Sequence, residues 1–143
     1  FQALDPREKV DSYGKLLNNV GGVLRGTQQD KVNLLENYKF VISFENSYHY
    51  GYNTEKIIEP FEVGCIPLYK GGERVKEYFN TESFLYMNDF ASLEDYVDRI
   101  FDINDNPELY EQIVLSDPLR MDKIEQDLAP QAILNKTLEK LNL

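Results

Sequence analysis

Cysteine, histidine and tryptophan are scarce in this sequence. Its 143 residues include one cysteine, one histidine and no tryptophan. A single cysteine, Cys65, excludes an internal disulfide framework and is typical of proteins kept in a reducing compartment. It lies in a predicted buried strand, so we interpret it as a packing residue. His49 has no second histidine beside it, and we interpret it as a solvent-facing loop residue and predict no metal site.

Positive charge and long apolar runs are scarce as well. Asp and Glu outnumber Lys and Arg by 25 to 15, which gives a net charge of −10. This acidity excludes nonspecific binding to nucleic acid or to an anionic membrane. No apolar run is long enough to span a bilayer, and no signal peptide is recognisable. Because Phe1 is not an initiator methionine, we expect the chain to be part of a longer protein.

The sequence does contain a regular alternation of predicted strands and helices. Short apolar runs predict strands over 39–44, 66–69 and 84–86, and a lead-in strand over 10–13. Helical spacing and capping residues predict helices over 28–37, 54–63, 73–78, 93–103 and 107–115. This alternation is typical of the α/β class, with a Rossmann-like parallel sheet and helices on both faces. We predict one domain over residues 1–118 and a helical tail, interrupted by Pro130, over 119–143.

The most informative stretch runs from Lys39 to Gly72. It predicts a buried strand, a polar aromatic loop, a helix that begins near Thr54, and a second strand that ends before Gly71. In open α/β sheets, such a loop and helix N-terminus form the usual site for phosphorylated ligands. A lysine in the first helical turn, Lys56, opposes the helix dipole, and a bound anion would reverse that cost. The stretch therefore predicts an anion site at the end of the first strand.

Two candidates for this site lie in the first turn of the helix. The ammonium of Lys56 could offset a diphosphate, although Lys56 could also be a solvated lysine paired with Glu59 or Glu62. Glu55 could bind hydroxyl groups of a ligand, although its carboxylate could also only stabilise the helix start. Both interpretations stay open for each residue.

Four further candidates lie in the loops. Asn46 could hydrogen-bond a ligand, or it could form an Asx turn at the start of the loop. Tyr52 could hydrogen-bond a ligand, or its ring could pack the loop on the helix. Glu45 could be a ligand contact or could only satisfy loop amides. Gly71, with Gly72, could let a phosphate or sugar approach the backbone, or could be a plain turn.

Two motifs in this stretch, Phe44-Glu45-Asn46-Ser47 and Tyr52-Asn53-Thr54-Glu55-Lys56-Ile57, carry a family resemblance. They are similar to the signature of the α1,3/1,4-fucosyltransferases, glycosyltransferase family 10. The similarity continues in register through Gly64-Cys65-Ile66-Pro67-Leu68-Tyr69 and covers roughly Lys39 to Tyr110. About a dozen positions of mixed chemistry agree in order and spacing, so the resemblance is specific.

The resemblance implies the C-terminal, donor-binding lobe of a GT-B glycosyltransferase. It implies GDP-fucose as the donor and transfer, with inversion, to a hydroxyl of a glycan acceptor. Lys56 would then stabilise the leaving diphosphate and Glu55 would bind hydroxyls of the ribose or the sugar. The catalytic base would come from a missing N-terminal lobe, so we expect no catalytic base in this chain. No metal would be required, and the arginine of the donor site would lie upstream or be Arg25.

Other functions stay open. The chain could be a non-catalytic sugar-nucleotide binding module, a glycosyltransferase that uses another nucleotide sugar, or an interaction domain with a vestigial site. The joint presence of Asn46, Tyr52, Glu55 and Lys56 favours a working donor site. The single cysteine favours a bacterial cytoplasmic enzyme, peripheral to the membrane, and a Golgi-lumenal enzyme is the alternative.

Overall fold

The computed structural model describes residues 3–4, 6–15, 17–22, 25–131, 135 and 138. In this part of the chain, three parallel strands form one sheet in the order β1-β2-β3. The strands are β1 (Phe40–Phe44), β2 (Ile66–Lys70) and β3 (Leu85–Tyr86). The helices are α1 (Gln28–Leu35), α2 (Glu55–Glu62), α3 (Val75–Tyr78), α4 (Leu93–Asn104), α5 (Pro107–Val114) and α6 (Met121–Leu128), with a 3-10 turn, η1, at Met87–Asp89.

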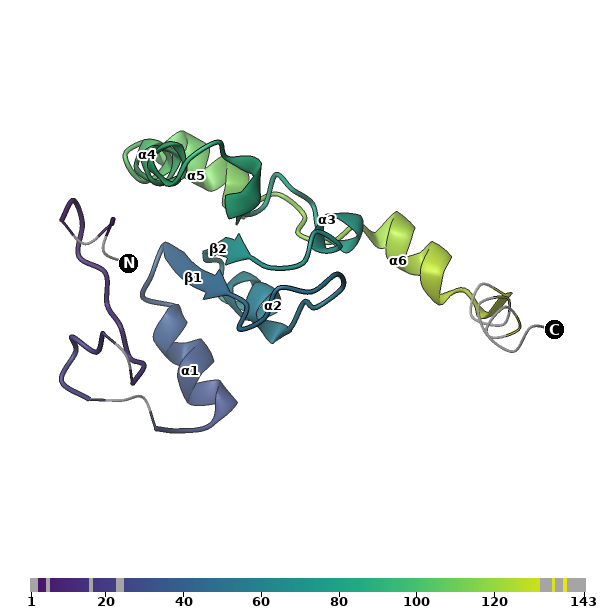
Figure 1. The fold of residues 1–143 in the computed structure, drawn as a ribbon, viewed down its shortest axis with the longest axis horizontal. Helices are drawn as coiled ribbons and strands as arrows, with labels where there is room; N and C mark the ends of the chain where they lie inside the picture. The colour runs from purple at the N-terminus through teal and green to yellow at the C-terminus, as the bar shows by residue number, and fades with distance from the viewer. Residues whose placement is uncertain are drawn as a thin grey trace.

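Helices cover both faces of the sheet, as the sequence predicts (Figure 1). Side chains alternate between faces along a strand, so Leu68 and Tyr69 of β2 point in opposite directions. Leu68 packs in a cluster with Ile100 of α4 and Ile113 of α5. Tyr69 packs on the other face with Ile57 of α2. The α/β, Rossmann-like prediction is therefore confirmed.

Short polar residues set where the helices begin. Thr27, Thr54, Ser92 and Asn106 are N-caps, and each side chain accepts a hydrogen bond from a backbone N–H of the first turn. A capped N–H would otherwise lack a partner, which is why these residue types mark helix starts. The predicted helices begin at these caps, while α3 is shorter than expected and begins at Val75.

The lead-in strand predicted over 10–13 is wrong. This segment is irregular, and backbone groups of Ser12 and Val10 bond to the side chain of Asn19. The Asn19 side chain accepts from the Ser12 N–H at 2.8 Å and donates to the Val10 carbonyl at 2.7 Å. In Figure 1 the segment runs along the side of β1 that faces away from β2.

The tail begins with α6, which extends from the rest of the chain in Figure 1. It is joined to α3, where the Tyr78 hydroxyl donates to the Asp127 carboxylate at 2.8 Å. Most of the tail predicted after Pro130 lies outside the described residues. In the part of the chain that the structure covers, no helix combines the length and apolarity that a membrane span needs.

Candidate functional site

The predicted site lies where β1 and β2 end. The Glu45 N–H donates to the Lys70 carbonyl at 2.8 Å, so the residues that follow the two strands, Glu45 and Gly71, lie side by side. The loop after β1 then leads to Thr54, the N-cap of α2. Parallel strands and their helices bring these groups to one edge of the sheet, where open α/β sheets bind ligands.

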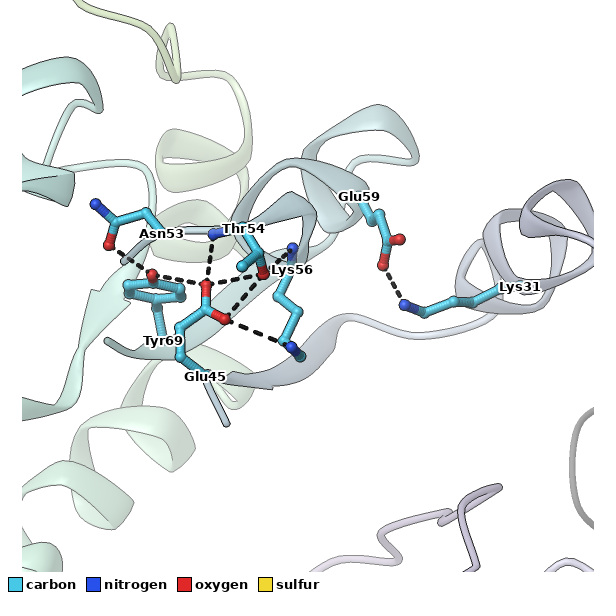
Figure 2. Close-up of polar contacts among 7 residues, drawn as sticks. All are labelled: Lys31, Glu45, Asn53, Thr54, Lys56, Glu59 and Tyr69. Atoms are coloured by element: carbon cyan, nitrogen blue, oxygen red, sulfur yellow. Dashed lines mark hydrogen bonds and ion pairs between the residues drawn. The ribbon is translucent and has the colours of Figure 1, made fainter. Parts of the chain in front are cut away.

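The Glu45 carboxylate is the centre of this edge (Figure 2). One oxygen, Oε1, accepts from the Thr54 N–H at 2.7 Å and from the Tyr69 hydroxyl at 3.0 Å. The other, Oε2, lies 2.8 Å from the Thr54 hydroxyl and 3.4 Å from the Lys56 ammonium. The side chain is only 1% exposed. The contacts therefore support the interpretation of Glu45 as a residue that holds the loop, and direct contact with a ligand stays a prediction.

Tyr69 connects Glu45 to Asn53. The hydroxyl has one proton, and an ionised carboxylate can only accept, so we assign that proton to Glu45. Asn53 then turns its amide nitrogen toward the Tyr69 oxygen at 2.9 Å and the Gly72 carbonyl at 3.0 Å. Its oxygen accepts from the Val75 N–H at 3.3 Å in that orientation. The loop is thereby bound to both β2 and the start of α3.

This environment changes the acidity of the buried groups. Burial pushes the pKa of the Glu45 carboxyl upward, but hydrogen bonds from Thr54 and Tyr69 and the charge of Lys56 outweigh it. The pKa of Glu45 is therefore held below its ordinary value. Burial and the neighbouring Glu45 charge raise the pKa of Tyr69. Glu45 is thus a carboxylate, and Tyr69 a neutral hydroxyl, at neutral pH.

Lys56 lies in the first turn of α2 with its side chain 25% exposed. Its charge pairs with Glu45, and not with Glu59 or Glu62 as the plainer interpretation suggested. Glu59 is buried and pairs with Lys31 of α1 (Figure 2). The ammonium of Lys56 is therefore held at the sheet edge, where its partly open side can meet an anion.

Gly71 and Gly72 are buried in this edge and have no room for side chains. A Cβ on Gly71 would lie 2.8 Å from Cγ of Glu45 and would collide with the Tyr69 hydroxyl. A Cβ on Gly72 would lie 2.7 Å from the backbone oxygen of His49. Close packing of the two loops explains this glycine pair, and contact of Gly71 with a ligand stays a prediction.

The remaining candidates lie on the outside of the same edge. Asn46, Tyr52 and Glu55 are exposed, in contrast to Glu45. Their side chains are available to a ligand that approaches Lys56, and their predicted roles are untested. Arg25 is also exposed, in the irregular segment before α1, and its role is untested too.

Sequence reasoning missed the residues that fasten the aromatic loop. The Tyr50 hydroxyl donates to Glu77 at 3.3 Å, and Arg74 lies with its guanidinium 6.0 Å from the Tyr50 ring. Arg74 also donates to the Tyr78 hydroxyl at 2.9 Å. In the sequence, the one indication of these contacts was an arginine two residues after Gly72. Arg74 adds a second cation beside the loop that carries Tyr52.

Several other predictions have a structural counterpart. His49 is exposed, as predicted. The Cys65 thiol is buried and donates to the Tyr38 carbonyl at 2.9 Å, and burial raises its pKa to about 11, so it is a packing residue. Among the described residues, no three His, Cys, Asp or Glu side chains lie close enough together for a metal ion. That the function requires no metal stays a prediction.

A hollow of the described chain lies away from this edge. A cavity of about 770 Å³ follows the side of β1 that faces away from β2, and its walls are largely apolar. Its lining includes Lys9 and Lys31, but these pair with Asp11 and Glu59. The N-terminus of α2 lies instead at the edge around Lys56, and a helix N-terminus favours a phosphate, so we place the candidate site there.

Comparison with protein families gives a match over residues 1–114. The matching family is described as glycosyltransferase family 10 (fucosyltransferase), C-terminal part. A putative fucosyltransferase R654 of Acanthamoeba polyphaga mimivirus is 31% identical over an alignment of 142 positions that covers 90% of this chain. The alpha-(1,3)-fucosyltransferase FucT of Helicobacter pylori is 33% identical over 119 residues, which is 83% of this chain. Each match spans 24% of the relative's own length.

Solved structures give the same answer for the fold. A crystal structure of an α1,3-fucosyltransferase with GDP-fucose is 32% identical and matches with a TM-score of 0.75. The match covers 82% of this chain and 33% of the solved one. The structure of an α1,3-fucosyltransferase with GDP matches equally well. This chain therefore corresponds to about a quarter to a third of each of these proteins.

Proposed function

Because this chain belongs to glycosyltransferase family 10, the fucosyltransferases, we propose that it is the donor-binding part of an inverting enzyme. The donor is GDP-fucose, and the acceptor is a hydroxyl of a glycan. Two solved relatives, described as complexes with GDP and with GDP-fucose, support the donor. The single observation that carries the proposal is the Lys56 ammonium, held by Glu45 at the carboxyl ends of β1 and β2.

Lys56 faces the charge that develops in the reaction. In an inverting transfer, the acceptor oxygen bonds to the anomeric carbon as the bond from that carbon to the phosphate oxygen breaks. The electrons of the broken bond go to the diphosphate of GDP, and a fixed ammonium stabilises that charge. Glu45 holds Lys56 there before the ligand arrives, so little reorganisation is needed.

The exposed residues around Lys56 have complementary roles in this proposal. Glu55, in the same helical turn, accepts hydrogen bonds from hydroxyls of the ribose or the sugar. Tyr52 and Asn46 offer a hydroxyl and an amide to phosphate and sugar oxygens. The acceptor proton goes to a base on an N-terminal lobe of the same protein, outside these residues. We therefore expect no transfer from these 143 residues alone.

The domain division follows from the same proposal. Residues 1–118 form the donor-binding domain, and 119–143 form a tail that packs on this domain or returns to the N-terminal lobe. The family match over 1–114 and the contact of α6 with α3 are compatible with this division. Cytoplasmic and Golgi-lumenal locations both remain open, because relatives occur in Helicobacter pylori and in Drosophila melanogaster.

Calorimetric titration of the full-length protein tests the proposal. Lys56→Ala should weaken GDP binding by roughly ten- to a hundredfold, which is about 1.5–3 kcal/mol, and should leave guanosine binding nearly unchanged. Guanosine lacks the diphosphate that Lys56 addresses. Lys39→Ala is the matched control, because Lys39 lies just before β1, at the opposite end of the strand.

The other outcomes separate the alternatives. Absence of GDP binding by the wild type would refute the proposed donor, and equal affinity for UDP would favour another nucleotide sugar. GDP-fucose binding without turnover would favour a non-catalytic module. Equal GDP affinity of the wild type and Lys56→Ala would remove Lys56 from the mechanism while leaving the donor in place.

A further inference from the structure

The short helix α3 contacts two parts of the chain that lie far apart in the sequence, and Figure 1 shows it between the sheet and α6. Glu77 of α3 accepts a hydrogen bond from the Tyr50 hydroxyl, in the loop that follows β1, at 3.3 Å. The Tyr78 hydroxyl donates to Asp127 of α6 at 2.8 Å. Arg74, just before α3, donates to both Glu77 at 3.2 Å and Tyr78 at 2.9 Å. Arg74 therefore joins the contact with the loop to the contact with α6.

The loop meets Arg74 at a tight turn, here called the Tyr52 turn. The Tyr52 N–H donates to the His49 carbonyl at 3.0 Å, which closes the turn. Gly51, inside it, has a φ of +79°, in the region that favours glycine. A Cβ on Gly51 would lie 3.6 Å from Cδ of Arg74, so the Arg74 side chain packs against the turn. The backbone at Gly72 is also close, because a Cβ there would lie 3.3 Å from the Tyr52 nitrogen. Arg74 and Gly72 together hold the turn.

The hydrogen bonds beyond Arg74 have a fixed direction. Tyr78 has one hydroxyl proton, which it donates to the Asp127 carboxylate, so its oxygen accepts from the Arg74 guanidinium. The hydroxyl thus bridges a cation and an anion, and charge-assisted hydrogen bonds of this kind are stronger than neutral ones. The Asp127 side chain is only 17% exposed and also pairs with Lys123 at 3.3 Å. The orientation of Arg74 therefore depends on where α6 places Asp127.

α6 is attached to α3 at its beginning as well. The Arg120 N–H donates to the Tyr78 carbonyl at 2.9 Å, and the Asn80 N–H donates to the Pro118 carbonyl at 3.0 Å. These backbone bonds hold the start of the helix, whereas Asp127 lies near its end. A displacement of the helix end would consequently break the bond to Tyr78 and release Arg74.

We propose that α6 positions the donor loop through Asp127, Tyr78 and Arg74. Arg74 is a positioning residue, which holds the Tyr52 turn without touching the donor. This inference rests on the donor role proposed above for Tyr52. Tyr52 lies two residues before Thr54, the N-cap of α2, so a fixed turn also fixes how Tyr52 meets a ligand of the site. Coupling between two sites is reciprocal, so a bound donor holds α6 in place by the same factor.

A purely structural role for these contacts makes a different prediction. If they only fasten α6, breaking them lowers Tm and leaves the affinity for GDP unchanged. Bound GDP would then leave the motions of α6 unchanged as well. The affinity for GDP and the response of α6 to GDP therefore distinguish the two roles.

Hydrogen exchange of the full-length protein, followed by mass spectrometry, measures the response of α6. Saturating GDP should slow exchange in α6 by about three- to tenfold in the wild type and leave it unchanged in Tyr78→Phe, which lacks the bridging hydroxyl. α5 is the internal control, because it packs on the opposite face of the sheet from α3. Unchanged exchange of α6 in a wild type that binds GDP would refute the proposal.

Calorimetric titration of variants of the full-length protein measures the affinity. Tyr78→Phe and Asp127→Ala should each weaken GDP binding by about three- to tenfold. Glu125→Ala, which removes an exposed carboxylate of the same helix, should change it less than twofold. The double variant should bind GDP as well as either single variant, because both substitutions break the same chain of bonds. Unchanged affinity in the single variants, or additive losses in the double variant, would contradict the coupling.

Failure of the proposed donor would leave the coupling testable. If the wild type does not bind GDP, the proposed function is wrong, and the amide signals of Tyr50 and Gly51 in NMR spectra still report on the turn. These signals should shift in Asp127→Ala and remain in place in Glu125→Ala. Unshifted signals in Asp127→Ala would refute the positioning of the loop by α6, whatever the donor is.

Discussion

The carboxyl end of β1 and its open edge, which is the side of β1 that faces away from β2, are built in opposite ways. At the carboxyl end, Glu45, Thr54 and Tyr69 satisfy one another, and the buried carboxylate is only 1% exposed. Along the open edge, Ile42 and Phe44 face a cavity and no strand of the described chain pairs there. The first region is held by contacts among these residues, whereas the second has no strand of the described chain beside it.

This difference bears on how the proposed enzyme is assembled. A site held by contacts within residues 45–72 has its shape before any other part of the protein arrives. The open edge, by contrast, has no backbone partner among the described strands. We therefore expect substitutions at the carboxyl end to destabilise this chain more than substitutions at the open edge.

The largest expected effect is at Glu45. Glu45→Ala should lower the free energy of unfolding of the 143-residue chain by about 2–4 kcal/mol, because Lys56, Thr54 and Tyr69 lose a buried partner. Ile42→Ala, at the open edge of the same strand, should cost only about 1 kcal/mol. Urea denaturation followed by circular dichroism measures both. Equal losses in the free energy of unfolding would show that the contacts of Glu45 stabilise the chain no more than the packing of Ile42 does.

A smaller effect is expected at Gly71. Gly71→Ala should destabilise the chain by about 1–3 kcal/mol, because the new methyl group collides with the hydroxyl of Tyr69, which is fully buried. Gly22→Ala is the matched control, since a Cβ on Gly22 meets nothing within 4 Å. Thermal unfolding of the two variants measures the loss of stability in each. A neutral Gly71→Ala would mean that Tyr69 can move and that the edge is looser than its contacts indicate.

The smallest effect is a dependence on pH. The pKa of Glu45 is lower in the folded chain than its ordinary value of 4.5. Its contribution to stability is therefore fully present above pH 4.5 and is lost as the pH falls through the lowered pKa of the folded state. The stability difference between the wild type and Glu45→Gln should shrink below pH 4.5 in urea denaturation series. Ile42→Ala removes no titrating group, and its cost should not follow pH in this way.

Local features of the fold could be predicted from sequence because their causes are local. Thr27, Thr54 and Ser92 cap helices within three residues of themselves, and the apolar runs mark β1 and β2 with small errors at their ends. The segment over 10–13 has the residues of a strand, but a strand also needs a neighbour. Asn19 bonds to its backbone instead, and nothing in the local pattern indicates that.

The candidate site was predictable in position but not in its division of roles. Lys56 and Glu55 could be placed in the first turn of a helix from spacing alone. That Glu45 is enclosed, while Asn46 beside it is exposed, depends on the direction in which each side chain leaves the loop. Tyr69 was missed because its partners, Glu45 and Asn53, lie 24 and 16 residues away in the chain.

The sequence by itself determined the family, the alternation of strands and helices, and the residues gathered near the ends of β1 and β2. Those properties depend on residue order, spacing and capping, which act over a few positions. Only the tertiary structure decided that Lys56 pairs with Glu45 and that β1 has an open edge. It also decided that the Tyr69 hydroxyl occupies the space that a side chain at Gly71 would need. Each of these depends on which segments meet across the sheet, and short-range residue patterns do not contain that information.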